Sequence, residues 1–446
     1  MRSLKPVWIP LVLVLLASPA RAVVRSDSTV ADTWRLENGL EVRTLHVPKA
    51  GGVSVTLAFR AGSGYEPAHM VGLSALLAEL QFMSAAGDVP ARTREEMQSL
   101  RPLGWDVQVG SRLARFTEIA SPAQLPGVLQ QAGRRLAGVT LTDADLKVAL
   151  ASVRRDAASH LFGLTSDVLY WRAGLLARGM DDEQIVECAS LKDLDKIKLK
   201  DIPPLLARWY NPGNASLAIA GDLTGLDVRA LVKSVFAPLP GGPAMPDTVQ
   251  VRLRGGKHTA VWKDLTAPIG VIAVEGPALS DTLHPAFYLS MLLTGSGLID
   301  AWGAPKPPLV ARFQYSLFDE PELVRFYPPV KADATDPDVI GSTFTWQLQE
   351  LGGRIVDMRI MDVLRRSVRW LLGGELSSGV LANLDRNPGG LASVTSGLAT
   401  RALWKGDAFW AGYLRRFDKL KIGHNYYYEW MEDAKHQTAL LLTPAR

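Results

Sequence analysis

The sequence predicts an α+β fold made of two similar domains, each with a mainly antiparallel sheet packed with helices. The chain has 446 residues, more than one hydrophobic core usually holds, so two or more domains are expected. Segments with the alternating pattern of strands and segments with the apolar spacing of helices are interleaved in both halves. The halves also have similar lengths and a similar order of elements, which predicts a duplicated unit.

The first predicted domain, residues 33–240, opens with strands and continues with helices. Residues 36–45 alternate polar and apolar side chains and are predicted as one strand that runs through an Asn-Gly pair, and residues 53–59 as the next strand. In residues 72–82 the leucines fall at positions i, i+3, i+4 and i+7, the spacing of one helix face. Residues 142–161 repeat this spacing, and Thr142 is expected to cap that helix.

A stretch rich in proline and glycine separates the two domains. The linker is predicted at residues 241–256, where such residues interrupt the regular patterns. The second domain, residues 257–440, begins again with strands and helices. Its predicted elements are a strand at 269–274, a helix at 284–293, a strand at 313–317 and helical stretches at 342–352 and 355–372.

Residues 1–22 have the pattern of a secretory signal peptide. Arg2 and Lys5 precede the apolar run 7–17, and the small-residue sequence Ala20-Arg21-Ala22 follows. The run is too short for a stable membrane anchor, and no cysteine follows that would carry a lipid. We expect cleavage after Ala22 and an exported, soluble protein, in a bacterial periplasm, without stable membrane insertion.

The charge of the expected mature chain is close to neutral. Removing the leader takes away three basic residues, so the 49 lysines and arginines fall to 46 against 45 acidic residues. This balance does not favour binding to nucleic acid. The single cysteine, Cys188, has no partner for an internal disulfide and is expected to be a buried, inert thiol.

Three short motifs follow one another along the first domain. They are Leu36-Glu37-Asn38-Gly39-Leu40-Glu41-Val42, then Gly62-Ser63-Gly64-Tyr65-Glu66-Pro67 leading into Gly72-Leu73, and Tyr210-Asn211-Pro212-Gly213-Asn214. In this order they resemble the amino-terminal domain of the insulinase/pitrilysin family of inverzincin metallopeptidases, which includes the mitochondrial processing peptidases. The resemblance implies two peptidase-like α/β domains that form half of a clamshell.

The resemblance also implies where a zinc site would lie. In active members the helix after the Gly-Leu pair carries the motif H-x-x-E-H, whose histidines bind zinc and whose glutamate takes a proton from the zinc-bound water. Both histidines and the base are absent here, so no catalytic residue is predicted and the chain is interpreted as a degenerate, non-catalytic relative. The five motif positions read Ala75, Leu76, Leu77, Ala78 and Glu79.

The family's third zinc ligand, a glutamate, is not replaced by an equivalent. It would fall near Arg155, with Asp156 as the nearest carboxylate. An arginine repels a divalent cation, and Glu79 and Asp156 together offer only two oxygen ligands, fewer than a zinc site needs. We therefore expect no metal and no cofactor, although zinc is usual in the family.

No other catalytic motif takes the place of the zinc site. The sequence has neither a Gly-x-Ser-x-Gly elbow nor a phosphate-binding glycine loop, and Ser63 and Ser296 are expected to be turn residues. No two histidines lie three to five residues apart, and each is expected to be a solvated or hydrogen-bonded surface residue. They are His46, His69, His160, His258, His284, His424 and His436.

The resemblance implies a way of binding peptides that does not need zinc. Family members add an extended peptide to a sheet edge beside the zinc helix. That edge corresponds here to residues 105–111, with Val107, Gln108 and Val109 as the candidate binding residues, although a covered strand fits the pattern equally well. In the second domain Tyr315 is the candidate for the tyrosine that orients the substrate, whereas the family's arginine would coincide with Pro308, and Arg312 is out of phase.

These observations lead to one preferred hypothesis and two alternatives. The preferred one is an exported non-catalytic subunit that partners a homologous catalytic zinc metallopeptidase in holding and processing an extended peptide, as a heterodimer. One alternative is a stand-alone binding or structural module of an envelope complex, and the other is a metallopeptidase with an unconventional metal site. The aromatic residues within 425–430 fit either an interface or an ordinary helix.

Overall fold

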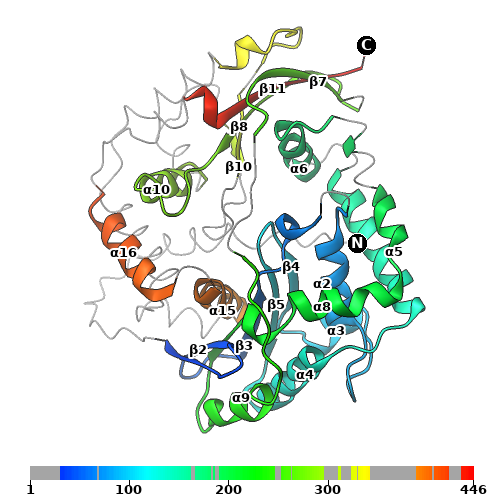
Figure 1. The fold of residues 1–446 in the computed structure, drawn as a ribbon. Helices are drawn as coiled ribbons and strands as arrows, with labels where there is room; N and C mark the ends of the chain where they lie inside the picture. Colours follow the sequence, from blue (N-terminus) through cyan, green and yellow to red (C-terminus); the bar gives the residue numbers. More distant parts are fainter. Residues whose placement is uncertain are drawn as a thin grey trace.

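The computed structural model describes two mixed sheets and the helices that cover them (Figure 1). Among the helices of these residues, none is both long enough and apolar enough to span a bilayer. The predicted leader, Cys188, Tyr315 and the helical stretches 342–352 and 355–372 lie outside the described residues. Those are 31–67, 70–161, 166–181, 184–185, 190–246, 253–262, 264–295, 310–312, 323–328, 330–341, 388–403, 406–420 and 433–445.

The first sheet has six strands in the order β1-β2-β6-β3-β5-β4. Only the β2–β6 pair is parallel, and the other four pairs are antiparallel. Strands β3 and β6 are buried along their whole length, as expected for the centre of a sheet covered on both faces. The strands are β1 (Asp32–Arg35), β2 (Glu41–His46), β3 (Val53–Phe59), β4 (Trp105–Val109), β5 (Ala114–Ala120) and β6 (Ala215–Gly221).

The prediction of one continuous strand over residues 36–45 is wrong. The Asn-Gly pair instead turns the chain between β1 and β2, which pair antiparallel. Gly39 has φ +93°, a conformation that favours glycine. The Asn38 side chain fixes the turn by donating to the carbonyls of Phe236, at 2.7 Å, and Leu239, at 3.1 Å. The pair is therefore a hairpin signal, which the alternating pattern concealed.

Helices of the first half pack mostly on one face of this sheet (Figure 1). The predicted helix over 72–82 is confirmed as α2, and that over 142–161 as α5. Thr142 caps α5 as predicted, because its hydroxyl accepts from the Asp145 amide at 3.1 Å. The helices are α2 (Leu73–Met83), α3 (Arg94–Leu100), α4 (Leu125–Ala137), α5 (Asp143–Leu161), α6 (Ser166–Ala177), α8 (Ile202–Trp209) and α9 (Val228–Phe236).

The second sheet repeats the topology of the first. Its order is β7-β11-β8-β10-β9, with β7 and β11 parallel and the other pairs antiparallel. Starting from the parallel pair, the strand order and the strand directions are the same as in β2-β6-β3-β5-β4 of the first sheet. This match confirms the predicted duplication. The elements are β7 (Gly256–Val261), β8 (Ile269–Glu275), β9 (Val310–Arg312), β10 (Leu323–Tyr327), β11 (Gln437–Thr443), α10 (His284–Gly295), α15 (Pro388–Leu403) and α16 (Gly406–Asp418).

Short 3-10 turns connect several of these elements. Ser63 lies in the first of them, as predicted, and its amide donates to the Gly110 carbonyl at 3.0 Å. The turns are η1 (Ser63–Tyr65), η2 (Pro122–Gln124), η3 (Lys192–Lys196), η4 (Leu199–Asp201), η5 (Pro212–Asn214) and η6 (Ala434–His436).

Each half lends one helix to the sheet of the other half. Helix α6 packs on β8, β10 and β11, and α15 packs on β2, β3, β5 and β6 (Figure 1). The α6 contact buries Val168 and Ala173 against Val271 and Leu440 of the second sheet. Because each sheet would otherwise expose an apolar face to water, the two halves depend on each other for stability.

Buried hydroxyl groups connect α15 to the first sheet. Thr395 lies within 2.8 Å of the Ser54 hydroxyl and 2.7 Å of the Thr56 hydroxyl, and Thr56 also bonds to Thr117 at 2.9 Å. All four side chains are buried. Buried polar groups are tolerated when they are hydrogen-bonded to one another, and such directional bonds fix the register of α15 on the sheet.

The motifs that carried the family resemblance are packing devices. A Cβ on Gly62 would lie 2.4 Å from the Ser111 backbone, and one on Gly213 would lie 2.0 Å from the Gly242 carbonyl oxygen. The buried Asn214 amide donates to the carbonyls of Trp209, at 2.7 Å, and Arg60, at 3.0 Å. The two glycines are therefore required because backbones approach each other closely, and Asn214 is required because its amide satisfies buried carbonyls.

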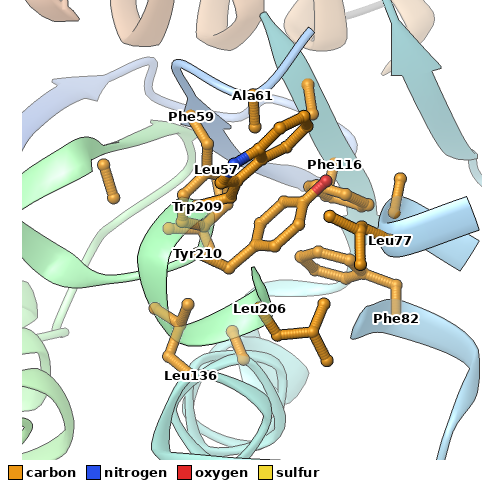
Figure 2. Packing of buried hydrophobic residues seen from close by; sticks show 14 of the residues in the cluster. Leu57, Phe59, Ala61, Leu77, Phe82, Phe116, Leu136, Leu206, Trp209 and Tyr210 are labelled. Atoms are coloured by element: carbon orange, nitrogen blue, oxygen red, sulfur yellow. The ribbon is translucent and has the colours of Figure 1, made fainter. Parts of the chain in front are cut away.

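Tyr210 anchors an aromatic cluster between the sheet and the helices (Figure 2). Its ring packs against Phe59, with centroids 5.0 Å apart, and against Phe82 and Phe116. Burial raises the pKa of the Tyr210 hydroxyl. The cluster fills the core under α8 and fixes the carboxyl end of that helix beside β3.

The expectation that every histidine lies on the surface is wrong for His284. This residue opens α10 and is only 2% exposed, and its Nδ1 lies 2.8 Å from the Tyr413 hydroxyl. Burial, reinforced by the charge of Arg416, lowers the pKa of His284 to about 3. A neutral imidazole whose Nδ1 accepts a hydrogen bond from the Tyr413 hydroxyl explains the arrangement.

We predict that the chain loses stability as the pH falls below about 6.5. The folded pKa of His284 lies below its ordinary value of 6.5, so between the two values only the unfolded chain binds the proton. The contribution of His284 to the free energy of unfolding is therefore complete above pH 6.5 and decreases by about 1.4 kcal/mol per pH unit as the pH falls toward 3. Between pH 7 and 5 the free energy of unfolding, measured by urea denaturation, should fall by about 2 kcal/mol less for His284→Gln than for the native chain.

The exposed histidine His160 provides the matched control for this measurement. His160→Gln should keep the pH dependence of the native chain, because that ring is accessible to water. An unchanged pH dependence in His284→Gln would show that His284 does not couple folding to protons.

Candidate functional site

Helix α2 carries the five positions that the family resemblance aligns with the zinc motif. Glu66 caps its start by accepting from the amides of Gly72, at 3.0 Å, and Ser74, at 2.8 Å. Burial raises the pKa of Glu66, although these hydrogen bonds oppose the shift. Gly72 has φ +87°, so glycine suits the turn into the helix. The motif thus begins at a fixed place beside the sheet.

The residues on α2 do not fit a zinc ion. Ala75 and Ala78 have no ligand atoms, and Leu76 and Leu77 are fully buried in the core. Glu79 is the single motif position with a carboxylate. Among the described residues, no group of three or more histidine, cysteine, aspartate or glutamate side chains is arranged to hold a metal ion.

Arg94 at the start of α3 pairs with the Glu79 carboxylate. Its Nη2 lies 2.5 Å and its Nε lies 3.1 Å from Oε2 of Glu79, so two nitrogens face the same carboxylate. The Glu79 side chain is only 8% exposed, whereas that of Arg94 is 44% exposed. A carboxylate this deeply buried needs a cation, and the guanidinium provides it at the water-accessible side.

Other groups of the site also act on Arg94. Its guanidinium carbon lies 5.9 Å from the centre of the Trp105 ring, within the range of a cation–π interaction. Burial lowers the pKa of Arg94, but Glu79 and, more weakly, Asp156 and Asp106 raise it, and the balance is a raised pKa. The three carboxylates thus stabilise one protein-borne cation between α2, α5 and β4.

Arg155, where the family would place a zinc-ligating glutamate, is exposed on α5. Its charge contributes to the lowered pKa of Glu95, which is set mainly by hydrogen bonds from the Glu95 backbone and the Thr93 side chain. Arg155 therefore adds a positive charge to the same region, and a divalent ion is disfavoured further.

Strand β4 forms one edge of the first sheet. It pairs with β5 on one side, and no strand among the described residues pairs with its other side. Helix α2 packs against β4, so this edge lies beside the degenerate motif. Val107 and Val109 pack on the core under α2. The three predicted peptide-binding residues of the first domain thus lie on an edge strand.

The backbone of β4 alternates between β5 and the open edge. Hydrogen bonds of 2.8 Å extend the β4–β5 register at both ends, from the Ile119 amide to the Gly104 carbonyl and from the Gly110 amide to the Leu113 carbonyl. Residues an even number of positions from Gly104 therefore direct their main-chain groups to β5, and the others direct theirs outward. Those that face the open edge are Trp105, Val107 and Val109.

Gln108 has a different position from its two neighbours. Its main chain faces β5, and its side chain lies on the sheet face of its cross-strand partner Arg115, which bonds to Ser396 of α15 at 3.2 Å. The Gln108 amide donates to Asp106 at 2.6 Å. Gln108 thus presents its side chain on the sheet face that α15 covers, whereas Val107 and Val109 present main-chain groups at the open edge.

The second-domain candidate, Tyr315, lies outside the described residues, as do Pro308 and the aromatic patch within 425–430. Arg312 ends β9 and pairs with Arg325 of β10. Strand β9 occupies the same topological position in the second sheet as β4 in the first.

Arg94 and Asp106 were missed by the sequence analysis. Neither belongs to the zinc motif, and Arg94 is separated from Glu79 by the turn after α2. One signal was available, because a glutamate among leucines on a buried helix face needs a partner cation. Thr93 and Glu96 form a capping box that places Arg94 in the first turn of α3.

We predict that removing the Arg94 charge destabilises the chain more than removing the Glu79 charge. Arg94→Met leaves a buried carboxylate without its cation and should cost about 1–2 kcal/mol, less than for a fully buried pair because Arg94 is half exposed. Glu79→Met leaves a guanidinium that water can solvate. The double variant should regain most of the loss, as measured by urea denaturation midpoints.

The exposed pair Lys196–Asp193, with side chains 77% and 48% exposed, provides the control. Lys196→Met should shift the midpoint by less than about 0.5 kcal/mol. If Arg94→Met shifted it no more than this control, the ion pair would have no structural role.

Comparisons with known proteins agree with this geometry. Residues 196–318 match the family model of the Peptidase M16 inactive domain. The structure is similar to a protease from Helicobacter pylori, with 17% identity, a TM-score of 0.70, and coverage of 93% of this chain and 100% of that one. It is also similar to the periplasmic protease PqqL from Escherichia coli, with 12% identity, a TM-score of 0.65, and coverage of 96% and 48%.

A third similar structure is a peptidase M16 inactive domain from Pseudomonas fluorescens, with 15% identity, a TM-score of 0.62, and coverage of 93% and 98%. No curated protein matches the chain. At these identities the structural likeness establishes the fold, which is that of one M16-like half. Together with the family model over residues 196–318, it confirms the resemblance of this chain to the insulinase/pitrilysin (M16) peptidases.

Proposed function

We propose that this chain is an exported, non-catalytic peptidase-like subunit that holds an extended peptide along β4, beside a catalytic homologue. The observation that carries the proposal is the open edge of β4 next to α2. There, Ala75 and Glu79 stand at the positions of the two zinc-binding histidines and Ala78 at that of the catalytic glutamate, and Glu79 is ion-paired with Arg94. This combination supports a role in holding a peptide and not in cutting it.

An edge strand offers a general way to bind extended peptides. Trp105, Val107 and Val109 direct main-chain donors and acceptors outward, and an added strand satisfies them with its own backbone. Such bonds depend little on the peptide's sequence. The site is also firm, because Val107 and Val109 are anchored in the core and Trp105 lies under Arg94.

A partner is suggested by the comparison with PqqL. The chain spans 48% of PqqL, so a second M16-like half would complete an assembly of similar size. We propose that a catalytic homologue supplies this half and its zinc. Export is supported by the leader-like residues 1–22 and by the description of PqqL as periplasmic.

We predict that a proline in β4 weakens peptide binding. Val107→Pro removes one outward amide but keeps the strand's pairing with β5, because that residue does not bond inward. The probe is a fluorescein-labelled, unstructured ten-residue peptide, measured by anisotropy with the mature chain. Affinity should fall about tenfold or more, since one lost hydrogen bond is worth roughly 1 kcal/mol and the proline ring also blocks the edge.

Val107→Ala is the matched control, since it keeps the amide and should bind within about threefold of the native chain. A peptide N-methylated at every residue has no main-chain donors and should bind neither the native chain nor Val107→Ala. Equal binding of the native chain and a folded Val107→Pro variant would rule out β4 as the binding edge.

We predict that the chain forms a stable complex with an M16 homologue that has an intact H-x-x-E-H motif. Co-expression followed by size-exclusion chromatography with light scattering should give a mass equal to the sum of the two chains. Separate elution of the two proteins would contradict the partnership. Recovery of an unrelated envelope assembly in a pull-down would favour a stand-alone module, and stoichiometric zinc in the purified chain would favour a displaced metal site.

A further inference from the structure

Asp106 is a carboxylate on the open edge strand that has no ion pair within the described part of the chain. Its side chain is exposed, and its hydrogen-bond partner is the neutral amide of Gln108, at 2.6 Å. We propose that Asp106 selects peptides that place a lysine or arginine side chain opposite it on β4. This inference rests on the proposed function and names the class of peptide that the edge prefers.

The backbone geometry brings an opposing side chain close to Asp106. Because the main-chain groups of Asp106 face β5, an antiparallel strand added to the outer edge would meet this residue as a non-hydrogen-bonded pair. In such pairs the Cα atoms lie about 4.5 Å apart and the side chains approach most closely. The opposing residue projects to the same sheet face as Asp106, so its charge is felt directly.

The nearby arginines are held by other groups. Arg115, two residues from the cross-strand partner of Asp106, donates to Ser396 of α15 at 3.2 Å. Arg94 bonds to Glu79 on the helix side of the sheet. The charges of Arg115 and Arg94 act on the Asp106 carboxylate only by long-range electrostatic attraction. The carboxylate therefore keeps an acceptor oxygen for a cation that arrives with the peptide.

The surroundings of Asp106 strengthen such a pair. Desolvation raises the pKa of the Asp106 carboxyl group, although the hydrogen bond from Gln108, the Val107 backbone and the charges of Arg115 and Arg94 oppose the shift. The group is thus accessible to water yet surrounded by protein atoms. A cationic side chain in this position would relieve the desolvation of the charged form, and the attraction would exceed that of a fully exposed pair.

The test uses three peptides that share one extended host sequence. In each peptide every second position carries the test residue, which is lysine, glutamine or glutamate. Registers that differ by two residues all place a test residue opposite Asp106, whereas a shift by one residue moves the test residues to the other face of the sheet. Binding to the mature chain is measured by anisotropy at low and physiological salt. We expect the lysine peptide to bind about threefold to tenfold more tightly than the glutamate peptide, with the difference reduced by salt.

Charge exchange at Asp106 identifies the responsible group. Asp106→Asn should remove the preference, and Asp106→Lys should reverse it in favour of the glutamate peptide. Glu37→Gln is the matched control, because Glu37 is an exposed carboxylate in the β1–β2 turn at the opposite edge of the same sheet. It should leave the preference unchanged.

The outcomes separate this inference from the proposed function. If the glutamine peptide binds but lysine and glutamate peptides bind equally, β4 holds peptides without selecting charge, and only the role of Asp106 is refuted. A preference that persists in Asp106→Asn also refutes it. If none of the peptides binds the native chain, both proposals fail.

Discussion

A buried carboxylate requires a compensating cation, and at the first-domain site of this chain the cation belongs to the protein. Glu79 projects from α2 with only 8% of its side chain exposed, and Arg94 reaches it from α3. The pair therefore determines how α2, α3 and β4 lie relative to one another, since Arg94 also contacts Trp105 at the start of the edge strand. A guanidinium has no open coordination position, so it balances charge without polarising a bound water.

The exchange of helices between the two halves explains how this edge stays rigid. Because α15 covers the far face of the first sheet, β4 and β5 are held from both sides, by α2 on one face and by contacts such as Arg115–Ser396 on the other. Helix α6 covers the second sheet in return. A firm edge loses little conformational entropy when a strand is added, and this favours binding through main-chain groups.

Local patterns predicted much of the fold, and the errors have identifiable physical causes. The strand at 53–59 and the helices at 72–82 and 142–161 were found because their spacing reflects one buried face. The hairpin at Asn38-Gly39 was missed because both of its strands alternate in the same phase. His284 was misplaced because tertiary packing, not local sequence, buries it. The exchange of α6 and α15 had no local signal, since it depends on contacts between residues far apart in the chain.

The candidate site was predictable only where it follows the family pattern. The alanines at 75 and 78 and the strand around Val107 are positions that an alignment with the zinc motif identifies. Arg94 and Asp106 become meaningful only when α3 and β4 lie beside α2, because a charge acquires its role from what surrounds it. Along this edge Arg94 lies near the helix face and Asp106 lies on the α15 face. A strand added at this edge would place alternate side chains toward Asp106 and toward the Arg94–Glu79 pair, so a one-residue shift in register would change which of them meet Asp106.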